Sequence, residues 1–110
     1  MLNRLPDITH LQFLVLEALD RGEQAGRDVR AVLAEHGVKN SAPAFYQMMA
    51  RLEQASFVEG WYAQTVVNGQ HLKERRYRIA RPGTRALRET RNFYLRRATT
   101  TRTARKGSNA

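Results

Sequence analysis

Five side chains between residues 41 and 51 have the chemistry needed to contact a nucleic acid. The amide of Gln47 can form a bidentate hydrogen-bond pair with adenine, and Arg51 can bind a guanine edge or a phosphate. Ala44 can touch a thymine methyl group, and Ser41 and Tyr46 carry hydroxyls that suit phosphate oxygens. The alternative interpretation is that Arg51 belongs to an ordinary solvated helix end and that Tyr46 is half buried in the core.

These five residues lie on one predicted helix, residues 41–53. Ser41 or Ala42 is its cap, and Pro43 falls in the first turn, where no N–H is needed and the fixed φ suits a helix. Its apolar residues follow the i, i+3, i+4, i+7 spacing of a buried face, namely Phe45, Met48, Met49 and Leu52. Because this face must pack on a core, the five candidate side chains are expected to point outward.

A hairpin is predicted directly after this helix, over residues 58–79. Val66 and Val67 lead into Asn68-Gly69, the strongest short-range signal for a two-residue turn. Polar groups near the turn that suit a phosphate backbone or a minor groove are Asn68, Gln70, His71, Lys73, Arg75 and Arg76. The alternative is a basic hairpin that is simply solvated.

A two-residue loop also fixes which residues of the hairpin face each other. Counting back from the turn places Trp61 opposite Arg76 and Glu59 opposite Arg78. This register predicts a cation–π contact between Trp61 and Arg76 and a cross-strand ion pair between Glu59 and Arg78.

Two helices before residue 41 are expected to support the outward-facing helix. The first begins near Thr9, which has capping-box spacing with Gln12, and ends around residues 20–22. The second runs from about residue 26 to 36 and stops at Gly37. Apolar residues surround almost the whole first helix, which indicates that one face packs on the domain core and another on a partner subunit. The alternative is that the domain encloses this helix completely.

Pro82 and Gly83 break the pattern before a last predicted helix, which continues to about residue 98. It carries an aromatic and apolar stripe with little core left to cover, so we expect it to pair with a second subunit. The residues expected at this dimer interface are Leu11, Leu14, Val15, Leu87, Thr90, Phe93 and Tyr94. Residues 99–110 are polar, basic and without periodicity, which predicts a disordered tail.

The fold class predicted by these elements is mainly α with a small β-hairpin. Helix followed by hairpin is the layout of a winged helix-turn-helix, in which the helix enters the major groove and the hairpin contacts the backbone. The expected division is a winged helix-turn-helix DNA-binding domain over residues 1–80, a C-terminal dimerisation helix over 81–98, and the tail over 99–110.

Charge is distributed unevenly along the 110 residues, whose formal net charge is +9. Residues 1–67 carry six basic against eight acidic side chains, a balance of −2, whereas residues 68–110 carry thirteen against two, a balance of +11. A basic second half beside a near-neutral first half is typical of a protein that meets a polyanion along one surface. The alternative is an arginine-rich surface that touches no nucleic acid.

Other classes of function find little support in the composition. There is no cysteine, so no disulfide or thiolate zinc site is possible, which fits a cytoplasmic protein. The three histidines lack metal-ligand spacing and there is no catalytic triad or phosphate loop, so we expect no enzyme, no metal and no cofactor. The N-terminal segment lacks the apolar core of a signal peptide, and we expect no contact with a membrane.

Several short motifs together resemble the PadR-type family of bacterial winged-helix regulators. Residues 25–29 are similar to its His-Gly-Tyr-Glu-aliphatic segment, Phe45-Tyr46 and Arg51-Leu52-Glu53 to its recognition helix, and residues 75–79 to its returning wing strand. Gly83 with Leu87 resembles its entry into the final helix, and the similarity spans residues 9–97. The chain departs from the family pattern at Arg27, Pro43, Ala44 and Gln47.

The resemblance implies a sequence-specific DNA-binding repressor. It implies a homodimer, held by the C-terminal helix on the partner's first helix. This dimer would bind a near-palindromic operator in double-stranded DNA and be released by a small-molecule effector or another signal. The main alternative is an interaction module whose basic surface binds a protein or RNA. Preference for one duplex sequence over random duplex separates the two.

Overall fold

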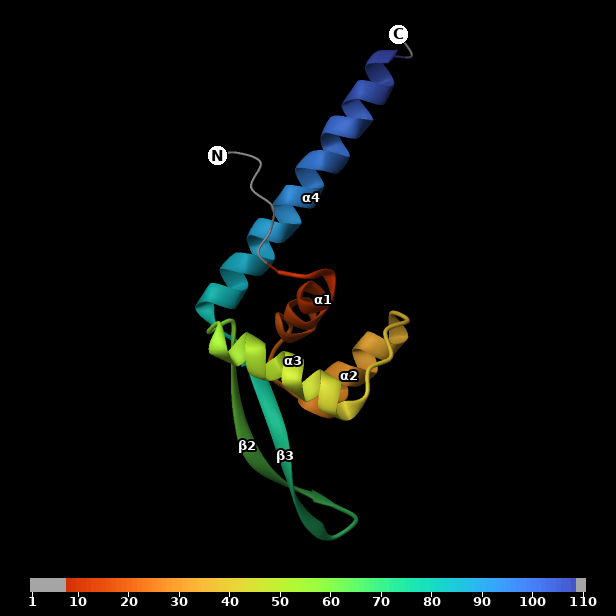
Figure 1. The fold of residues 1–110 in the computed structure, drawn as a ribbon. Helices are drawn as coiled ribbons and strands as arrows, with labels where there is room; N and C mark the ends of the chain where they lie inside the picture. The colour runs from red at the N-terminus through yellow and green to blue at the C-terminus, as the bar shows by residue number, and fades with distance from the viewer. Residues whose placement is uncertain (1–7, 109–110) are drawn as a thin grey trace.

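The computed structural model of the chain describes residues 8–108, and the side chains of residues 8–98. The elements are, in order, α1 (His10–Leu19), β1 (Gln24–Ala25), α2 (Gly26–Glu35), α3 (Ala42–Gln54), β2 (Val58–Val67), β3 (Gln70–Ile79) and α4 (Arg81–Ser108). Figure 1 shows α1 enclosed between the other helices, with the β2–β3 hairpin and the C-terminal half of α4 projecting in opposite directions. The predicted winged helix-turn-helix is confirmed.

Local signals in the sequence fix the ends of the first helices. The hydroxyl of Thr9 accepts from the backbone N–H of Gln12 at 3.0 Å, and the Gln12 side chain accepts from the backbone N–H of Thr9 at 3.0 Å, so the capping box is present. At the end of α2, Gly37 has φ +82° and its N–H donates to the carbonyl of Ala34. The α2 stop at Gly37 is therefore confirmed, because few other residues adopt that conformation.

The sheet has one strand more than the predicted hairpin. The hairpin has the predicted register, including Trp61 opposite Arg76, and both turn residues have positive φ, +52° at Asn68 and +79° at Gly69. The additional strand β1 pairs antiparallel with β3, which gives the order β1-β3-β2. β1 has only two residues, too few for any alternating pattern to reveal it in the sequence.

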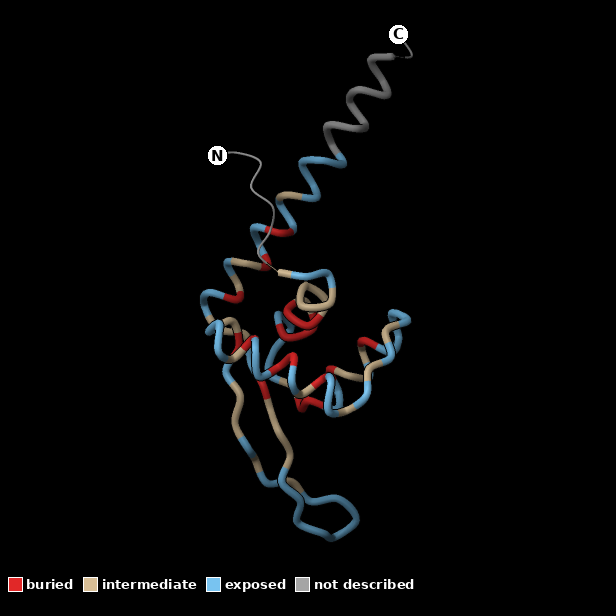
Figure 2. Tube along the Cα trace, viewed as in Figure 1, coloured by how far each residue is buried: buried red, intermediate tan, exposed pale blue. Residues whose placement is uncertain are grey.

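The core lies where α1, α2, α3 and the base of the hairpin meet (Figure 2). The predicted apolar face of α3 is buried there in full, at Phe45, Met48, Met49 and Leu52. Three residues expected at a dimer interface are buried in the same single chain, with exposures of 0% for Val15, 1% for Leu87 and 3% for Thr90. The prediction was wrong for these three, because α4 packs its first turns on α1 of its own chain and covers them.

Helix α4 is longer than predicted. It continues to Ser108, past the expected end at residue 98 and through most of the expected disordered tail. Between Gly83 and Gly107 there is neither proline nor glycine, and alanine and arginine are strong helix formers, so nothing in that segment stops the helix. Residues 109 and 110 of the predicted tail lie outside the described part of the chain.

Candidate nucleic-acid interface

Four of the five side chains predicted on the recognition helix are exposed on α3. Ser41 is its N-cap, and the Ser41 hydroxyl accepts from the backbone N–H of Ala44 at 3.2 Å, which leaves its own proton free to donate. Ala44, Gln47 and Arg51 follow along the exposed side of the helix, opposite the buried apolar face. The structure therefore presents a hydrogen-bonding and weakly basic stripe along the solvent side of α3.

Tyr46 lies elsewhere and belongs to the packing of α3 on α2. Its side chain is half-buried, and its ring meets that of Phe45 edge-on, with centroids 5.0 Å apart. A Cβ added at Gly26 would lie 2.8 Å from the Tyr46 hydroxyl, so the tyrosine fills the space that this glycine leaves at the start of α2. The alternative interpretation from the sequence, a half-buried tyrosine, describes it correctly.

The hairpin presents one of its faces on the same side as α3. Side chains alternate between the two faces of a strand, so Lys73 shares a face with Tyr77, which is buried under α3. Beyond the edge of α3 this face continues with exposed polar groups, including His71 and Gln64, the latter opposite Lys73. Gln64 was missed in the sequence, although the predicted register already places it opposite Lys73. Asn68 is exposed at the turn.

Arg75 was predicted to contact DNA, but in the structure it is bound within the chain. Its Nη2 donates to Oε1 of Glu53, at the end of α3, at 2.6 Å. Its guanidinium carbon lies 4.7 Å from the ring centre of Tyr62 and 5.7 Å from that of Tyr77. Burial lowers the pKa of Arg75, but the Tyr77 hydroxyl and the charge of Glu53 outweigh it and raise the pKa, so the guanidinium stays charged.

Arg76 is bound in the same way on the opposite face of the sheet. It donates to Glu74 at 2.7 Å and to Glu23, in the segment before β1, at 3.0 Å. Glu74 also forms an ion pair with Arg27, at the start of α2, in which Nη2 of Arg27 lies 3.0 Å from Oε1 of Glu74. The atoms of this ion pair are not aligned as in a hydrogen bond. These carboxylates attract the guanidinium of Arg76 away from the aromatic ring opposite it.

The predicted contact between Arg76 and Trp61 is therefore wrong, and a neighbouring arginine takes that place. The guanidinium carbon of Arg78 lies 5.6 Å from the centre of the Trp61 ring. The predicted ion pair between Arg78 and Glu59 is confirmed, at 2.7 Å. The most basic segment of β3 thus has its three arginines, Arg75, Arg76 and Arg78, in contact with carboxylates or aromatic rings of the same chain.

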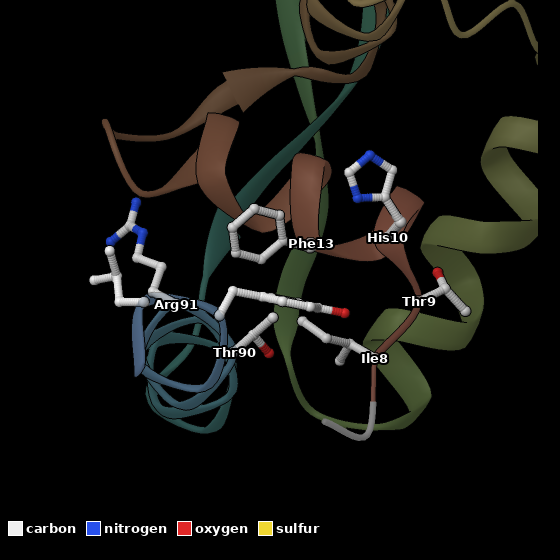
Figure 3. A pocket seen from close by; sticks show the side chains of 8 residues that line it. Ile8, Thr9, His10, Phe13, Thr90 and Arg91 are labelled. Atoms are coloured by element: carbon white, nitrogen blue, oxygen red, sulfur yellow. The ribbon is translucent and has the colours of Figure 1, made fainter. Parts of the chain in front are cut away.

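A groove runs between the start of α1 and α4, on the side of the molecule away from the wing. Its volume is about 670 Å³. Figure 3 shows Ile8, from the segment before α1, and Phe13, from α1, facing the groove on one side. Thr90 and Arg91 of α4 face it on the other side. The residues that line it are Ile8, Thr9, His10, Phe13, Thr90, Arg91, Tyr94 and Leu95.

Exposed apolar side chains lie along this groove. Tyr94 is 61% exposed and Leu95, which the sequence interpretation did not single out, is 64% exposed. Of the other residues predicted for a dimer interface, Leu11, Leu14 and Phe93 are half-buried. The groove and its rim thus retain apolar surface that the single chain leaves uncovered.

Possible metal ligands and membrane-spanning helices can be checked directly in the described residues. Within residues 8–98 no three His, Asp or Glu side chains gather as they would around a metal ion, and His10, His36 and His71 lie on separate elements. No helix in the described part of the chain is both long and apolar enough to cross a membrane.

The sequence matches no protein-family model and no curated protein. Solved structures do share the fold. A PadR-like regulator from Bacillus cereus is 21% identical, with TM-score 0.67 over 86% of this chain and 89% of that one. A PadR-family regulator from Eggerthella lenta is 26% identical, with TM-score 0.63 over 86% and 80%. Bacillus subtilis PadR in complex with operator DNA is 20% identical, with TM-score 0.60 over 74% of this chain.

These similarities confirm the predicted resemblance to PadR-type regulators in the fold. This chain spans 46% of the length of Bacillus subtilis PadR. The Bacillus cereus and Eggerthella lenta proteins with this fold are transcriptional regulators.

Proposed function

We propose that this chain is a PadR-type transcriptional regulator that binds operator DNA, with α3 in the major groove and the β2–β3 wing on the flanking backbone. The observation that carries the proposal is the division of α3 into a fully buried apolar stripe and an exposed polar stripe. The wing face that continues past α3 carries Lys73 and exposed polar side chains beside the exposed Tyr62 and Val66, so one duplex can contact both. Bacillus subtilis PadR, which shares the fold, was solved with operator DNA.

Each exposed residue has a role suited to its chemistry. Gln47 reads a base edge, most readily adenine, because its amide can both donate and accept. Arg51 binds a phosphate or a guanine edge, and Ala44 contacts a thymine methyl. Ser41, at the N-terminus of α3, donates to a phosphate, where the helix dipole also favours negative charge. On the wing, the groups that contact the backbone are Asn68, His71 and Lys73.

The proposed active form is a homodimer. Exposed Tyr94 and Leu95 on α4, with half-buried Leu11 and Leu14 on α1, give each chain an apolar surface that a second copy can cover. In a two-fold dimer the two α3 helices would meet half-sites one helical turn apart, which explains a near-palindromic operator. The mode of control that the resemblance supports is repression, with the operator blocked until a small-molecule effector or another signal releases the dimer.

The first test is selection from a random duplex library at near-physiological salt, with light scattering on the same sample. We expect an inverted repeat and a mass twice that of the 12.6 kDa chain. Uniform recovery of all duplexes would refute sequence-specific binding and favour a protein or RNA partner.

Substitutions within α3 then test the roles. Gln47→Ala should relax the preference at one base position of each half-site, at a cost of about 1–3 kcal/mol for the selected base. Gln54→Ala is the matched control, because it removes the same exposed side chain from the C-terminal end of the same helix. Base contacts concentrate at the N-terminal part of such a helix, so Gln54→Ala should leave the preference unchanged.

A further inference from the structure

Ion pairs on both faces of the wing's base connect it to α3, to α2 and to the segment before β1, and we infer that they set the direction of the wing. We call these pairs the wing clamp: Glu53–Arg75 on one face, and Arg76–Glu23 with Arg27–Glu74 on the other. Arg75 and Arg76 are then positioning residues and not DNA contacts. The inference rests on the proposed function, because the wing's direction matters only if α3 and the wing bind one duplex.

The first half of the clamp joins the end of the recognition helix to β3. Glu53 is the penultimate residue of α3, and its carboxylate meets Arg75 at 2.6 Å with both side chains largely buried, at 27% and 24% exposure. The backbone leaves room for this pair at Gly60 of β2. A Cβ there would lie 2.8 Å from Oε1 of Glu53 and 2.9 Å from Nη2 of Arg75, so only glycine at this position accommodates the pair unchanged.

The second half of the clamp joins β3 to the start of α2. Arg76 reaches Glu23 and Glu74, and Glu74, with a side-chain exposure of 11%, also meets Arg27 of α2. Consecutive residues of a strand point to opposite faces, so Arg75 and Arg76 hold the wing from its two sides. Bending the wing toward either face must lengthen one set of ion pairs.

The length of the wing makes this restraint important. Arg75 lies opposite Tyr62, so at about 3.3 Å per residue the turn at Asn68 lies roughly 20 Å beyond Arg75. A tilt of about 10° at the base would therefore move the tip by about 3.5 Å, which is more than the length of a hydrogen bond to a phosphate. A small change at the clamp is enough to separate the wing tip from a duplex that α3 already holds.

Removal of Glu53 distinguishes a clamp from a DNA contact by the sign of its effect. If Arg75 contacted phosphate, Glu53→Ala would release the arginine, remove a negative charge and tighten binding. If the pair is a clamp, Glu53→Ala should weaken binding to the selected duplex about fivefold, which corresponds to about 1 kcal/mol at 1.4 kcal/mol per tenfold. Glu59→Ala is the matched control, since it removes one carboxylate from an exposed pair with Arg78 on the same hairpin.

Glu59→Ala should leave affinity unchanged or slightly higher, because it removes negative charge without loosening the wing. Equal tightening in Glu53→Ala and Glu59→Ala would overturn the clamp. The double variant Glu53→Arg with Arg75→Glu should recover part of the loss, since the reversed pair restores the attraction between α3 and β3.

A distance measurement tests the clamp without DNA. The chain has no cysteine, so spin labels can be placed at Glu35→Cys on α2 and Gln70→Cys beside the turn, both exposed positions. We expect Glu53→Ala to broaden the distance distribution, and Glu59→Ala to leave it as narrow as in the labelled parent. A distribution that stays narrow in Glu53→Ala overturns the clamp. Failure of the parent to select any duplex would refute the proposed function instead, and this distance measurement would still decide the clamp.

Discussion

Replacement of Gly83 by alanine should destabilise the protein, although alanine is the better helix former. Gly83 is buried in the first turn of α4, where the helix crosses the connection between α3 and β2. A Cβ at this position would lie 2.1 Å from the carbonyl oxygen of Phe57 and 3.0 Å from Cγ1 of Ile79. The Phe57 carbonyl also accepts from the backbone N–H of Ala80 at 3.0 Å, so it cannot turn away without losing that bond.

Two opposing effects determine the size of this change. Alanine in place of glycine inside a helix gains at most about 1 kcal/mol. An ordinary carbon–oxygen contact is about 3.3 Å, so α4 or the Phe57 carbonyl must shift by roughly 1 Å to accept the methyl group. Overpacking of this kind costs about 1–3 kcal/mol, and more when backbone must move, so we expect a net loss of about 1–2 kcal/mol.

Thermal unfolding followed by circular dichroism measures this loss. For a domain of this size, a loss of about 1–2 kcal/mol should lower Tm by about 5–10 °C. Asn92→Ala is the control, because it places alanine at an exposed position of the same helix and should leave Tm unchanged or slightly higher. A Gly83→Ala variant as stable as the parent would refute the close seating of α4 on Phe57.

Three further predictions concern Gly26 at the start of α2, Gly69 in the hairpin turn and Tyr77 of β3. Gly26→Ala should lower the free energy of unfolding by about 1–2 kcal/mol, since its Cβ would lie 2.8 Å from the Tyr46 hydroxyl. The double variant Gly26→Ala with Tyr46→Ala should lose less free energy of unfolding than the sum of the two single variants. Gly69→Ala should lower Tm, because φ is +79° there and alanine in that region costs about 1 kcal/mol. Burial raises the pKa of Tyr77 above 10.0, so the contribution of Tyr77 to stability should be constant near neutral pH and should fall as pH rises above about 10. In urea unfolding across that range Tyr77→Phe should reduce the fall, whereas Tyr94→Phe, at an exposed position, should not.

Much of the fold followed from short-range signals in the sequence. The capping box at Thr9, the stop at Gly37 and the Asn68-Gly69 turn each depend on a few neighbouring residues, and each is present as predicted. The hairpin register followed from the turn alone, since a two-residue loop fixes every pair behind it. The exposed residues of α3 followed from the helical spacing of its apolar face.

What the sequence could not give was the partner of each charged side chain. Glu23 is 53 residues from Arg76 in the chain, and no periodic pattern links them. Their pairing depends on β1, whose two residues leave no signal, and on the angle between α2 and the sheet. The same limit affected the dimer prediction, because burial of Leu87 depends on how α4 crosses α1 and not on the spacing within α4.

The pairing of arginines within the chain bears on how strongly salt should weaken DNA binding. A formal charge of +9 per chain would suggest many phosphate contacts in a dimer. However, Arg75 and Arg76 at the base of the wing are already paired with carboxylates. Three exposed basic side chains lie next to α3 or on the wing face beside it and form no ion pair within residues 8–98. They are Lys39, Arg51 and Lys73.

Three such side chains per subunit give about six phosphate contacts in a dimer, and each contributes about −0.9 to the slope of log K against log salt concentration. The expected slope for the selected operator is therefore about −5. Lys73→Ala should make it shallower by about 2, because the substitution removes one phosphate-binding cation from each subunit, whereas Glu53→Ala should weaken binding with little change in slope. A slope near −10 in the parent would contradict this assignment, because it would require the paired arginines to leave their carboxylates and bind phosphate.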